Sequence, residues 1–552
     1  MISFQKSSKI FDWLWRTSKG FRRHALLNIL IGLLLVGADL LFVYITKLTI
    51  DIATKANHSF DLTTAIILLA VVMLTQVSLG ISYRWISATL GARALNRMQR
   101  KIFAQILDAD WAKLKLFHTG DITNRLQKDT SEITRFIVEQ TPSFVTTVAK
   151  LIGAFFMLYA MDSRLAIIII FLLPVFYLIS RIFVKQLRKI THEVRQTESK
   201  IQGIIQETFQ HVLVIKTLMV NRLIADNMQA NQQQLENQIK HKTVYTSLTA
   251  TLLNLGFATG YFISFFWGTL SLYEGVITYG SMIAFIQLVG QIQSPIRSLA
   301  HYVPTFINIS TSVERLNELQ DIPTVNTQGT ALTGKIGIKI KDLQYTYEGK
   351  PAPTINALNL NIDPGQKVAI LGKTGSGKTT LIRLLLSLIN PQHGHIKIFT
   401  DTEERNVTAA TRVNFAYLPQ GNTLLSGSIL ENLKMAKPDA EMDEIVNALT
   451  MAHAQFVLDL PNGLETTCGE GGHSLSEGQA QRICIARTIL RNAPILIFDE
   501  ATSALDVETE KQIINNLAQH FSNKTIIFIT HRLALLDICD QVIELEKVNK
   551  KG

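Results

Sequence analysis

Apolar residues gather in six long runs within the first 300 or so positions of the chain. The runs are roughly Leu26–Ile50, Leu62–Ile86, Phe144–Met161, Leu165–Val184, Leu248–Tyr273 and Met282–Leu299. An α-helix needs about 17–25 apolar residues to cross a bilayer whose hydrocarbon core is ~30 Å thick. The pattern therefore predicts six membrane-spanning helices.

The polar joints between these runs indicate how the predicted spans are oriented. Three joints are short, Asp51–Asp61, Asp162–Arg164 and Glu274–Ser281, and the other two are long and rich in Lys and Arg. Because positively charged loops stay in the cytoplasm, we expect both long joints and both termini to be cytoplasmic. Apolar residues at helical spacing in the long joints predict that helices continue beyond the membrane.

The pattern changes after Pro323. A polar stretch, Thr324–Gly334, is followed by short β-branched strands, Gly-marked turns and helical stretches, which are typical of an α/β domain. We therefore divide the chain into a membrane domain over 1–320, a linker over 321–335 and an α/β domain over 336–552. At the start of the membrane domain, Phe11–Arg23 mixes Trp and basic residues and predicts an interfacial helix.

Composition and charge agree with a membrane protein. The chain is 47% hydrophobic, with a mean hydropathy of +0.20 and a formal net charge of +10. Because the basic excess precedes Ile336, beside the apolar runs, it favours a membrane lipid partner and no nucleic acid. The three cysteines, Cys468, Cys484 and Cys539, have neither disulfide nor metal-ligand spacing. We expect buried thiols in a reducing compartment.

One glycine-rich segment has the spacing of a phosphate-binding loop. It fits G-x-x-x-x-G-K-[ST], follows the strand-like run Val368–Leu371 and opens a Leu-rich helix. Backbone N–H groups and the helix N-terminus would bind phosphate oxygens, Lys378 would reach the β- and γ-phosphates, and the Thr379 hydroxyl would bind Mg²⁺. The predicted ATP-binding residues here are Gly372, Lys373, Thr374, Gly375, Ser376, Gly377, Lys378, Thr379 and Thr380.

Two further segments carry candidate chemistry. The apolar run Ile495–Phe498 ends in Asp499, placed to hold Mg²⁺ through water, and Glu500, placed to polarise an attacking water. Ser476 is typical of the N-cap of a helix, where free N–H groups can bind an anion. Taken alone, the first could be a buried strand with an exposed acidic end, and the second a plain helix cap.

The order of these motifs resembles that of the ATP-binding cassette (ABC) ATPases. It runs from the phosphate loop through Gln420, Leu475–Gln479, Asp499–Glu500 and Ser503–Asp506 to His531. In the membrane part, Phe117–Ile122 with Arg125 and Asp129 resembles the first cytoplasmic loop of ABC exporters. The resemblance implies an α-helical transmembrane bundle of six helices followed by an α/β P-loop ABC ATPase domain, the layout of an exporter-type half-transporter.

The resemblance also implies roles at matching positions. Glu500, His531 and Gln420 would be catalytic, and Mg²⁺ would be held by Thr379, Gln420 and Asp499. Tyr347 would stack on adenine. Ser476, Gly478, Gln479 and Asp506 would complete the ATP site of a second subunit. Glu477 departs from the commonest residue, Gly, at a position that varies in the family. Short helices near Trp111–Phe117 and Val212–Met219 would transmit motion to the spans.

We therefore expect an ATP-driven exporter half that works as a dimer in a bacterial cytoplasmic membrane and moves a hydrophobic or amphipathic substrate. A complete catalytic set on one chain favours a homodimer. The alternatives are a regulatory ABC membrane protein, a peptide exporter, an importer and a soluble ABC ATPase. The six apolar runs argue against the last, and fusion of the two parts argues against an importer.

Charged and polar residues inside the predicted spans leave the substrate path open. Asp39 and Lys150 either pair with each other or meet a charged substrate. Gln287, Gln291 and Gln293 would give the sixth span a polar face, and the aromatic fifth span faces either lipid or a substrate path. Lipid, drug, peptide and metal-conjugate exporters share this plan, so the sequence does not identify the substrate.

Overall fold

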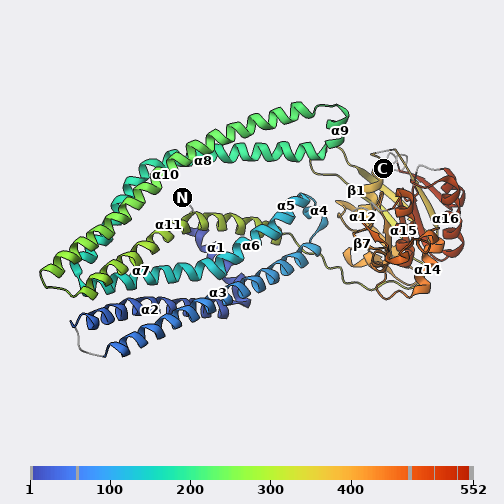
Figure 1. The fold of residues 1–552 in the computed structure, drawn as a ribbon. Helices are drawn as coiled ribbons and strands as arrows, with labels where there is room; N and C mark the ends of the chain where they lie inside the picture. Colours follow the sequence, from blue (N-terminus) through green and yellow to red (C-terminus); the bar gives the residue numbers. More distant parts are fainter. Residues whose placement is uncertain are drawn as a thin grey trace. The chain divides into compact units, whose positions relative to one another are not determined.

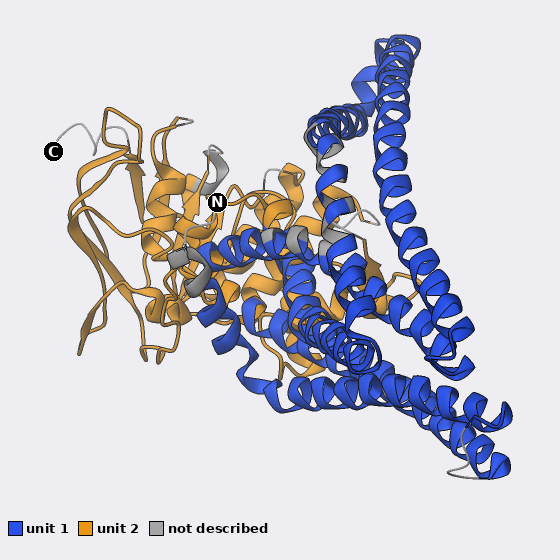
Figure 2. Cartoon of the chain, turned by 90° about the vertical axis from the view of Figure 1, so that its left-hand side faces the viewer, with its two compact units in different colours: residues 1–102, 122–318 blue, residues 103–121, 319–552 orange. Residues whose placement is uncertain are grey.

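The computed structural model describes residues 4–56, 61–373, 375–469, 475–502, 504–530 and 533–545. The chain divides into two compact units, coloured separately in Figure 2. The helical unit comprises Met1–Ile102 and Ile122–Glu318, and the α/β unit comprises Phe103–Asp121 and Leu319–Gly552.

The helical unit is built from long helices joined by short turns (Figure 1). Each of the six predicted spans lies within a different long helix. These helices are α2 (Arg22–Ala53), α3 (Leu62–Leu107), α7 (Thr141–Met161), α8 (Ser163–Gln210), α10 (Asn221–Tyr273) and α11 (Tyr279–Gln320). Most run far past the apolar stretch, as expected, and the 53 residues of α10 extend about 80 Å. The shorter helices are α1 (Phe4–Thr17), α5 (Thr119–Asn124), α6 (Thr130–Arg135) and α9 (Val212–Thr217).

Four of the helical stretches in the described residues are long and apolar enough to cross a membrane. They are Arg22–Ala53, Leu62–Leu107, Asn221–Tyr273 and Thr119–Met161, the last interrupted by π-helical turns at Arg125–Asp129 and Phe136–Gln140. In α8 the part whose side chains are continuously described is the shorter apolar stretch Ser163–Leu172. Helix α11 does not qualify, because the glutamines and the arginine of the predicted sixth span dilute its apolar residues.

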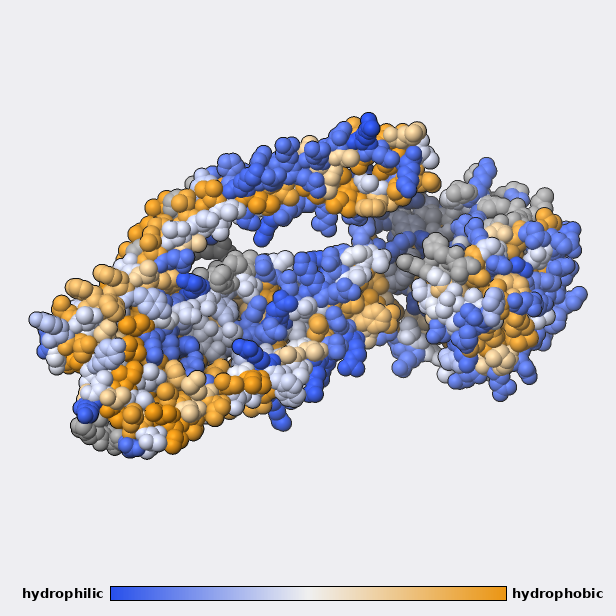
Figure 3. Space-filling model, in the orientation of Figure 1, coloured by the Kyte–Doolittle hydropathy of each residue, from blue (hydrophilic) through white to orange (hydrophobic). Residues whose placement is uncertain are grey.

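Apolar side chains on the membrane helices point outward. On α2, Leu30, Leu34 and Leu41 are each about half exposed, and on α10 Phe262, Phe265 and Phe266 are more than half exposed. Figure 3 shows apolar side chains gathered on the surface of the helical unit. Such surfaces are suited to lipid tails rather than water. The fifth-span phenylalanines therefore favour the lipid-facing alternative, although Phe257 is buried.

The α/β unit contains two larger sheets. The four-stranded antiparallel sheet has the order β2-β1-β4-β5, and the five-stranded parallel sheet has the order β11-β3-β10-β9-β6. Strands β9 and β10 are buried along their whole length, as expected for the centre of a parallel sheet. The strand bounds are β1 (Gly337–Tyr345), β2 (Ile355–Ile362), β3 (Lys367–Leu371), β4 (His393–Phe399), β5 (Glu404–Asn406), β6 (Phe415–Leu418), β7 (Gly427–Ser428), β8 (Thr467–Cys468), β9 (Ile495–Asp499), β10 (Thr525–Ile529) and β11 (Gln541–Glu544).

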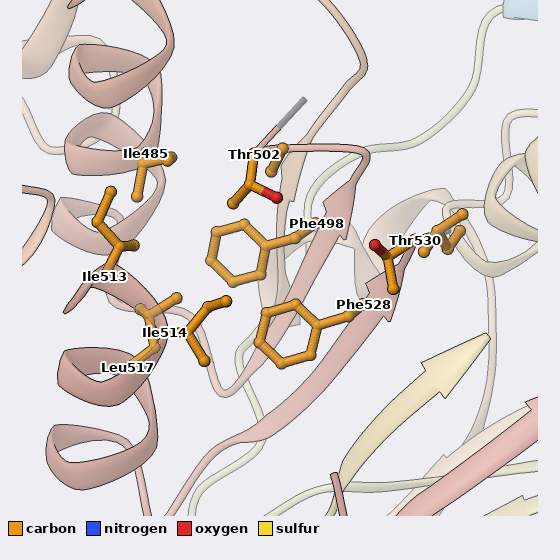
Figure 4. A pocket seen from close by; sticks show the side chains of 10 residues that line it. Ile485, Phe498, Thr502, Ile513, Ile514, Leu517, Phe528 and Thr530 are labelled. Carbon is orange, nitrogen blue, oxygen red and sulfur yellow. The ribbon is translucent and has the colours of Figure 1, made fainter. Parts of the chain in front are cut away.

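From β1 onward, the described part of the α/β unit has five α-helices, of which α13 and α14 pack against α15. They are α12 (Lys378–Leu385), α13 (Ile429–Lys434), α14 (Met442–Met451), α15 (Glu477–Leu490) and α16 (Val507–His520). Figure 4 shows Phe498 of β9 and Phe528 of β10, with ring centroids 5.5 Å apart, facing side chains of α15 and α16. The space among them is only about 10 Å³, which makes it a packed core rather than a ligand site. All three cysteines are free, and Cys468 and Cys484 are buried.

A segment of the first long joint, residues 103–121, belongs to the α/β unit. Its short helix α4 (Trp111–Leu114) places Trp111 and Ala112 against the apolar core beneath the sheets. The Asp110 N–H donates to the Pro323 carbonyl at 2.8 Å, and Ala109 forms an antiparallel bridge with Thr324. The division into 1–320, 321–335 and 336–552 stays a prediction; the two units of the structure part between Glu318 and Leu319.

Candidate nucleotide-binding and catalytic site

The parallel sheet brings the predicted ATP-site residues together at one edge. The phosphate loop follows β3, Gln420 follows β6, and Glu500 follows β9, so all three extend from carboxyl ends of parallel strands. They line a cleft of about 520 Å³. Its lining residues are Tyr347, Lys350, Thr354, Lys373, Gly375, Gly377, Lys378, Thr379, Thr380, Arg383, Gln420 and Glu500.

Glycine is required at two positions of the phosphate loop. Gly375 and Gly377 have φ values of +88° and +100°, a backbone conformation that residues other than glycine rarely adopt. A Cβ on Gly377 would lie 2.8 Å from Ile355 Cδ1 and 3.0 Å from the Thr354 carbonyl oxygen. Gly377 directly precedes α12, so this geometry exposes the first N–H groups of the helix to the cleft.

The loop also contains polar groups suited to phosphate. The Lys378 ammonium group donates to the Gly372 carbonyl, so the cation folds back over its own loop. Among the described residues, the Ser376 hydroxyl is buried and has no hydrogen-bond partner. A phosphate oxygen would accept from both groups, which fits a bound nucleotide.

Asp499, at the end of β9, is 8% exposed. Burial raises the pKa of its carboxyl group, and a hydrogen bond from the Tyr417 hydroxyl to Oδ2 at 3.2 Å opposes that rise. No group of three or more His, Cys, Asp or Glu side chains that could hold a metal is found in the described chain. Mg²⁺ commonly takes one or two carboxylates together with substrate phosphates, so Asp499 with Thr379 and Gln420 is a fitting set of oxygen donors.

Glu500 is held in a strained backbone conformation. Its φ of +50° is unusual for a residue other than glycine, and such strain concentrates at functional sites. The Glu500 N–H donates to the Ile529 carbonyl at 2.9 Å, and Oε2 accepts from Gln420 Nε2 at 2.6 Å. The carboxylate that the sequence predicts to be catalytic is therefore held by the glutamine predicted to act beside it.

Gln481, which the sequence reasoning missed, supports Glu500 from α15. Its Nε2 donates to the Glu500 carbonyl at 3.4 Å, and its Oε1 accepts from the Ala504 N–H at 3.0 Å. The side chain is 5% exposed. A polar residue on an otherwise apolar buried helix face was the available signal.

Tyr347 lies at the mouth of the cleft, where it could stack on a base. Its hydroxyl accepts from Arg383 Nη1 at 2.8 Å and from Thr380 Oγ1 at 3.3 Å, and its ring meets that of Tyr345 edge to face. The Arg383 guanidinium lies 5.2 Å from the Trp111 ring centroid. Arg383, also missed from sequence, therefore links the cleft to α4.

The predicted second-subunit residues lie elsewhere on the chain. Ser476 caps α15 through a reciprocal pair of hydrogen bonds with Gln479, and neither they nor Gly478 line the cleft. Asp506 caps α16 by accepting from the Thr509 N–H at 2.9 Å, which lowers the pKa of Asp506. Thr374 and His531 lie outside the described residues.

Both parts of the sequence match ABC transporter families. Residues 25–296 match the ABC transporter transmembrane region, and residues 355–503 match the ABC transporter family of the nucleotide-binding part. The two matches cover the helical unit's spans and the phosphate loop through Asp499 and Glu500. The resemblance inferred from the motif order is therefore confirmed.

Individual relatives agree with this assignment. YgaD of Bacillus subtilis, assigned by name to multidrug export ATP-binding/permease proteins, is 27% identical over 96% of this chain and 93% of its own. LktB of Mannheimia glucosida, a leukotoxin translocation ATP-binding protein, is 29% identical over 87% of this chain and 68% of its own.

A solved structure shares the fold. The bacterial Atm1-family ABC exporter with ATP bound superposes with a TM-score of 0.78 at 22% identity, covering 95% of this chain and 94% of that one. The predicted fold class and ATPase class are confirmed. The chain thus belongs to the ABC transporter family, as an integral membrane half-transporter whose helical transmembrane region precedes an ABC ATPase domain that couples ATP to export.

Proposed function

We propose that two copies of this chain form an alternating-access dimer that exports a hydrophobic or amphipathic substrate, driven by Mg²⁺-ATP. The dimer would lie in the cytoplasmic membrane, with both termini and the α/β units in the cytoplasm. The names of the relatives support export, since YgaD is assigned to multidrug export and LktB to leukotoxin translocation. Their bacterial origin supports the cytoplasmic membrane.

The proposal of a dimer rests on one observation: the cleft of a single chain lacks the residues predicted to contact the γ-phosphate from a second subunit. It is lined by the phosphate loop, Gln420 and Glu500, but by none of the described residues from Leu475 to Gln479. In a shared site the N-terminus of α15 in the second chain, with Ser476 and Gly478, would contact the γ-phosphate. The N-terminus of a helix stabilises an anion, so this arrangement suits the triphosphate.

The residues of the cleft have distinct roles in this proposal. Lys378 and the N–H groups at the start of α12 bind phosphate oxygens, and Tyr347 stacks on the base. Mg²⁺, held by Asp499, Thr379 and Gln420, would neutralise charge on the phosphates. Glu500, oriented by Gln420, positions the attacking water. The predicted role of His531, which lies outside the described residues, is to contact the γ-phosphate. Catalysis by such a site is positioning and electrostatic stabilisation.

An apolar tip on the helical unit also supports contact with a second chain. Around α9, between α8 and α10, Leu213, Leu218 and Met219 are 74%, 65% and 86% exposed. The tip lies in a long basic joint, well outside the predicted spans, so lipid does not account for its exposure. Docked on the partner, it would transmit the opening and closing of the ATP sites, a population shift between two states.

Cross-complementation of two inactive variants tests the shared site. Lys378→Ala disables the phosphate loop, and Ser476→Arg blocks the start of α15, so each homodimer should lose ATPase activity. Co-expression of the two chains with different affinity tags should yield heterodimers with one intact composite site and restored phosphate release. Lys397→Ala, on an exposed salt bridge of the antiparallel sheet, is the matched lysine control. Purified heterodimers with only background activity would refute the shared site.

A further inference from the structure

A layer of polar side chains crosses four of the membrane helices at one depth. It contains Asp39 of α2, Gln76 of α3, Lys150 of α7 and Gln291 of α11. Each lies between 11 and 14 residues from the outer end of its helix, which corresponds to roughly 16–21 Å at 1.5 Å per residue. Ionisable side chains at such depth are costly and mark functional sites.

Asp39 is the centre of this layer. Its Oδ2 accepts from Lys150 Nζ at 2.5 Å, and its Oδ1 accepts from Gln76 Nε2 at 3.1 Å. Gln291 Nε2 reaches the Asp39 carbonyl at 3.5 Å. The first alternative left by the sequence, an Asp39–Lys150 pair, is therefore formed.

The layer still has hydrogen-bonding capacity to offer. Gln287 and Gln291 lie one turn apart on α11, and their Oε1 atoms are buried without a partner in the described chain. The Lys150 ammonium group has three N–H donors, and one of them binds Asp39. The side chains of Lys150 and Asp39 are 29% and 26% exposed, so a ligand can reach them.

Gln293, on the same helix, is a polar residue with a structural role and serves as a comparison for the Asp39–Lys150 pair. It is 4% exposed, and its Nε2 donates to the Phe257 carbonyl at 3.1 Å. Gly260 makes room for it, since a Cβ there would lie 2.3 Å from Gln293 Nε2. Gln293 lines a pocket of about 200 Å³, but its amide is hydrogen bonded to the backbone of α10. The side chains of the Asp39–Lys150 pair are more exposed, and they neighbour Gln291, whose Oε1 has no partner among the described residues.

We propose that this layer binds the polar headgroup of the exported amphiphile, and that the headgroup is zwitterionic. Its acidic oxygen would contact Lys150, and its N–H donors would contact Asp39 and the amide oxygens of Gln287 and Gln291. The empty layer is neutral because Asp39 and Lys150 cancel, and a zwitterion keeps it neutral while forming two opposite-charge contacts. A singly charged headgroup would leave one member of the pair unpaired in a poorly solvated place. This inference rests on the proposed export function.

The test compares amphiphiles that have one hydrocarbon chain of equal length and differ in headgroup. The probes are lysophosphatidylethanolamine (zwitterionic with N–H donors), lysophosphatidylcholine (zwitterionic without them), lysophosphatidylglycerol (anionic) and an uncharged alkyl maltoside. Each is titrated below its micellar concentration against the ATPase rate of the full chain in lipid discs. Lysophosphatidylethanolamine should stimulate at a concentration at least tenfold below the anionic and uncharged probes.

Asp39→Leu with Lys150→Leu distinguishes a headgroup site from a structural ion pair. Replacing a partly buried ion pair by apolar residues commonly preserves folding, so a purely structural pair would leave the ranking of headgroups unchanged. A headgroup site predicts that lysophosphatidylethanolamine loses its tenfold advantage in this variant. Asp39→Asn with Lys150→Gln repeats the test with polar, uncharged side chains should the leucine pair not fold.

Thr75→Val is the matched control in the same layer. The Thr75 hydroxyl donates to the Val71 carbonyl of its own helix, so the variant should keep the wild-type ranking. A wild-type rate that responds equally to all four probes, or to none, would overturn the zwitterion inference, as would an unchanged ranking in both double variants. If the wild-type chain had no ATPase activity above that of the Lys378→Ala variant, the result would instead refute the export function on which the inference rests.

Discussion

The α/β unit and the helical unit arrange their apolar side chains in opposite ways. In the α/β unit, β9 and β10 are buried along their whole length. On α2 of the helical unit, Leu30, Leu34 and Leu41 are about half exposed, whereas Asn28 of the same helix is fully buried. The difference shows that the surrounding solvent determines which side chains are buried. Water favours burial of apolar side chains in the α/β unit, whereas lipid can surround leucine side chains at the surface of the helical unit.

The polar sites differ for the same reason. The α/β unit places Glu500 and Gln420 at strand ends that open into an aqueous cleft. The helical unit keeps Asp39 and Lys150 between helices, where each has the other as a counter-charge. Changes in the first site should act on chemistry, and changes in the second on selectivity.

The largest effect is expected from Glu500→Gln, which tests the chemical half of this comparison. Loss of the carboxylate that we propose positions the water should lower the ATPase rate about 10²–10⁴-fold, while nucleotide binding persists because the amide keeps the shape of the side chain. Phosphate release and nucleotide binding measure the two effects. Glu508→Gln, in the first turn of α16, is the control. A rate above half of wild type would contradict the assignment.

A matched pair of apolar truncations should have different effects on stability in the two units. Ile497→Ala in fully buried β9 should cost about 2–5 kcal/mol of stability, because it leaves a cavity. Leu34→Ala on α2 should cost less than about 1 kcal/mol, because lipid contacts that surface before and after helix packing. Residual ATPase activity after graded heating in lipid discs compares the two. Equal losses would show that α2 packs in protein rather than lipid.

The smallest effect is expected from Tyr417→Phe, which probes the buried carboxylate of the α/β unit. The hydrogen bond from Tyr417 lowers the pKa of Asp499, which burial has raised, so its removal raises that pKa further. In the proposed site Asp499 would hold Mg²⁺ only when ionised, and the ATPase rate should therefore fall at a higher pH on acidification. A hydrogen bond of about 1 kcal/mol corresponds to a shift of about 0.7 pH units. An unshifted pH profile would exclude this role for Tyr417.

The sequence was informative where local pattern decides the structure. Apolar runs located the membrane helices, and the spacing of Gly372 to Thr379 identified the loop that β3 and α12 hold in place. It was uninformative where partners come from distant segments. Arg383, Tyr417 and Gln481 carry no motif of their own, and their roles arise from contacts with Tyr347, Asp499 and Glu500.

The same limit applies inside the membrane part. Asp39 and Lys150 are 111 positions apart, and no periodicity could show that they pair. The predicted interfacial helix over Phe11–Arg23 comprises the end of α1 at Thr17, a 3₁₀ turn over Ser18–Gly20 and the start of α2, and its place at the membrane interface stays a prediction.

The bridge between Ala109 and Thr324 bears on how the protein can be divided for experiments. An ATPase fragment beginning at residue 336 would be continuous in sequence but would lack the piece of the α/β unit that contains Trp111 and Ala112. The apolar surface that these side chains cover would then face water, which favours self-association of the fragment. Supplying residues 103–121 as a separate peptide, or grafting them ahead of Leu319, should restore a monomeric fragment.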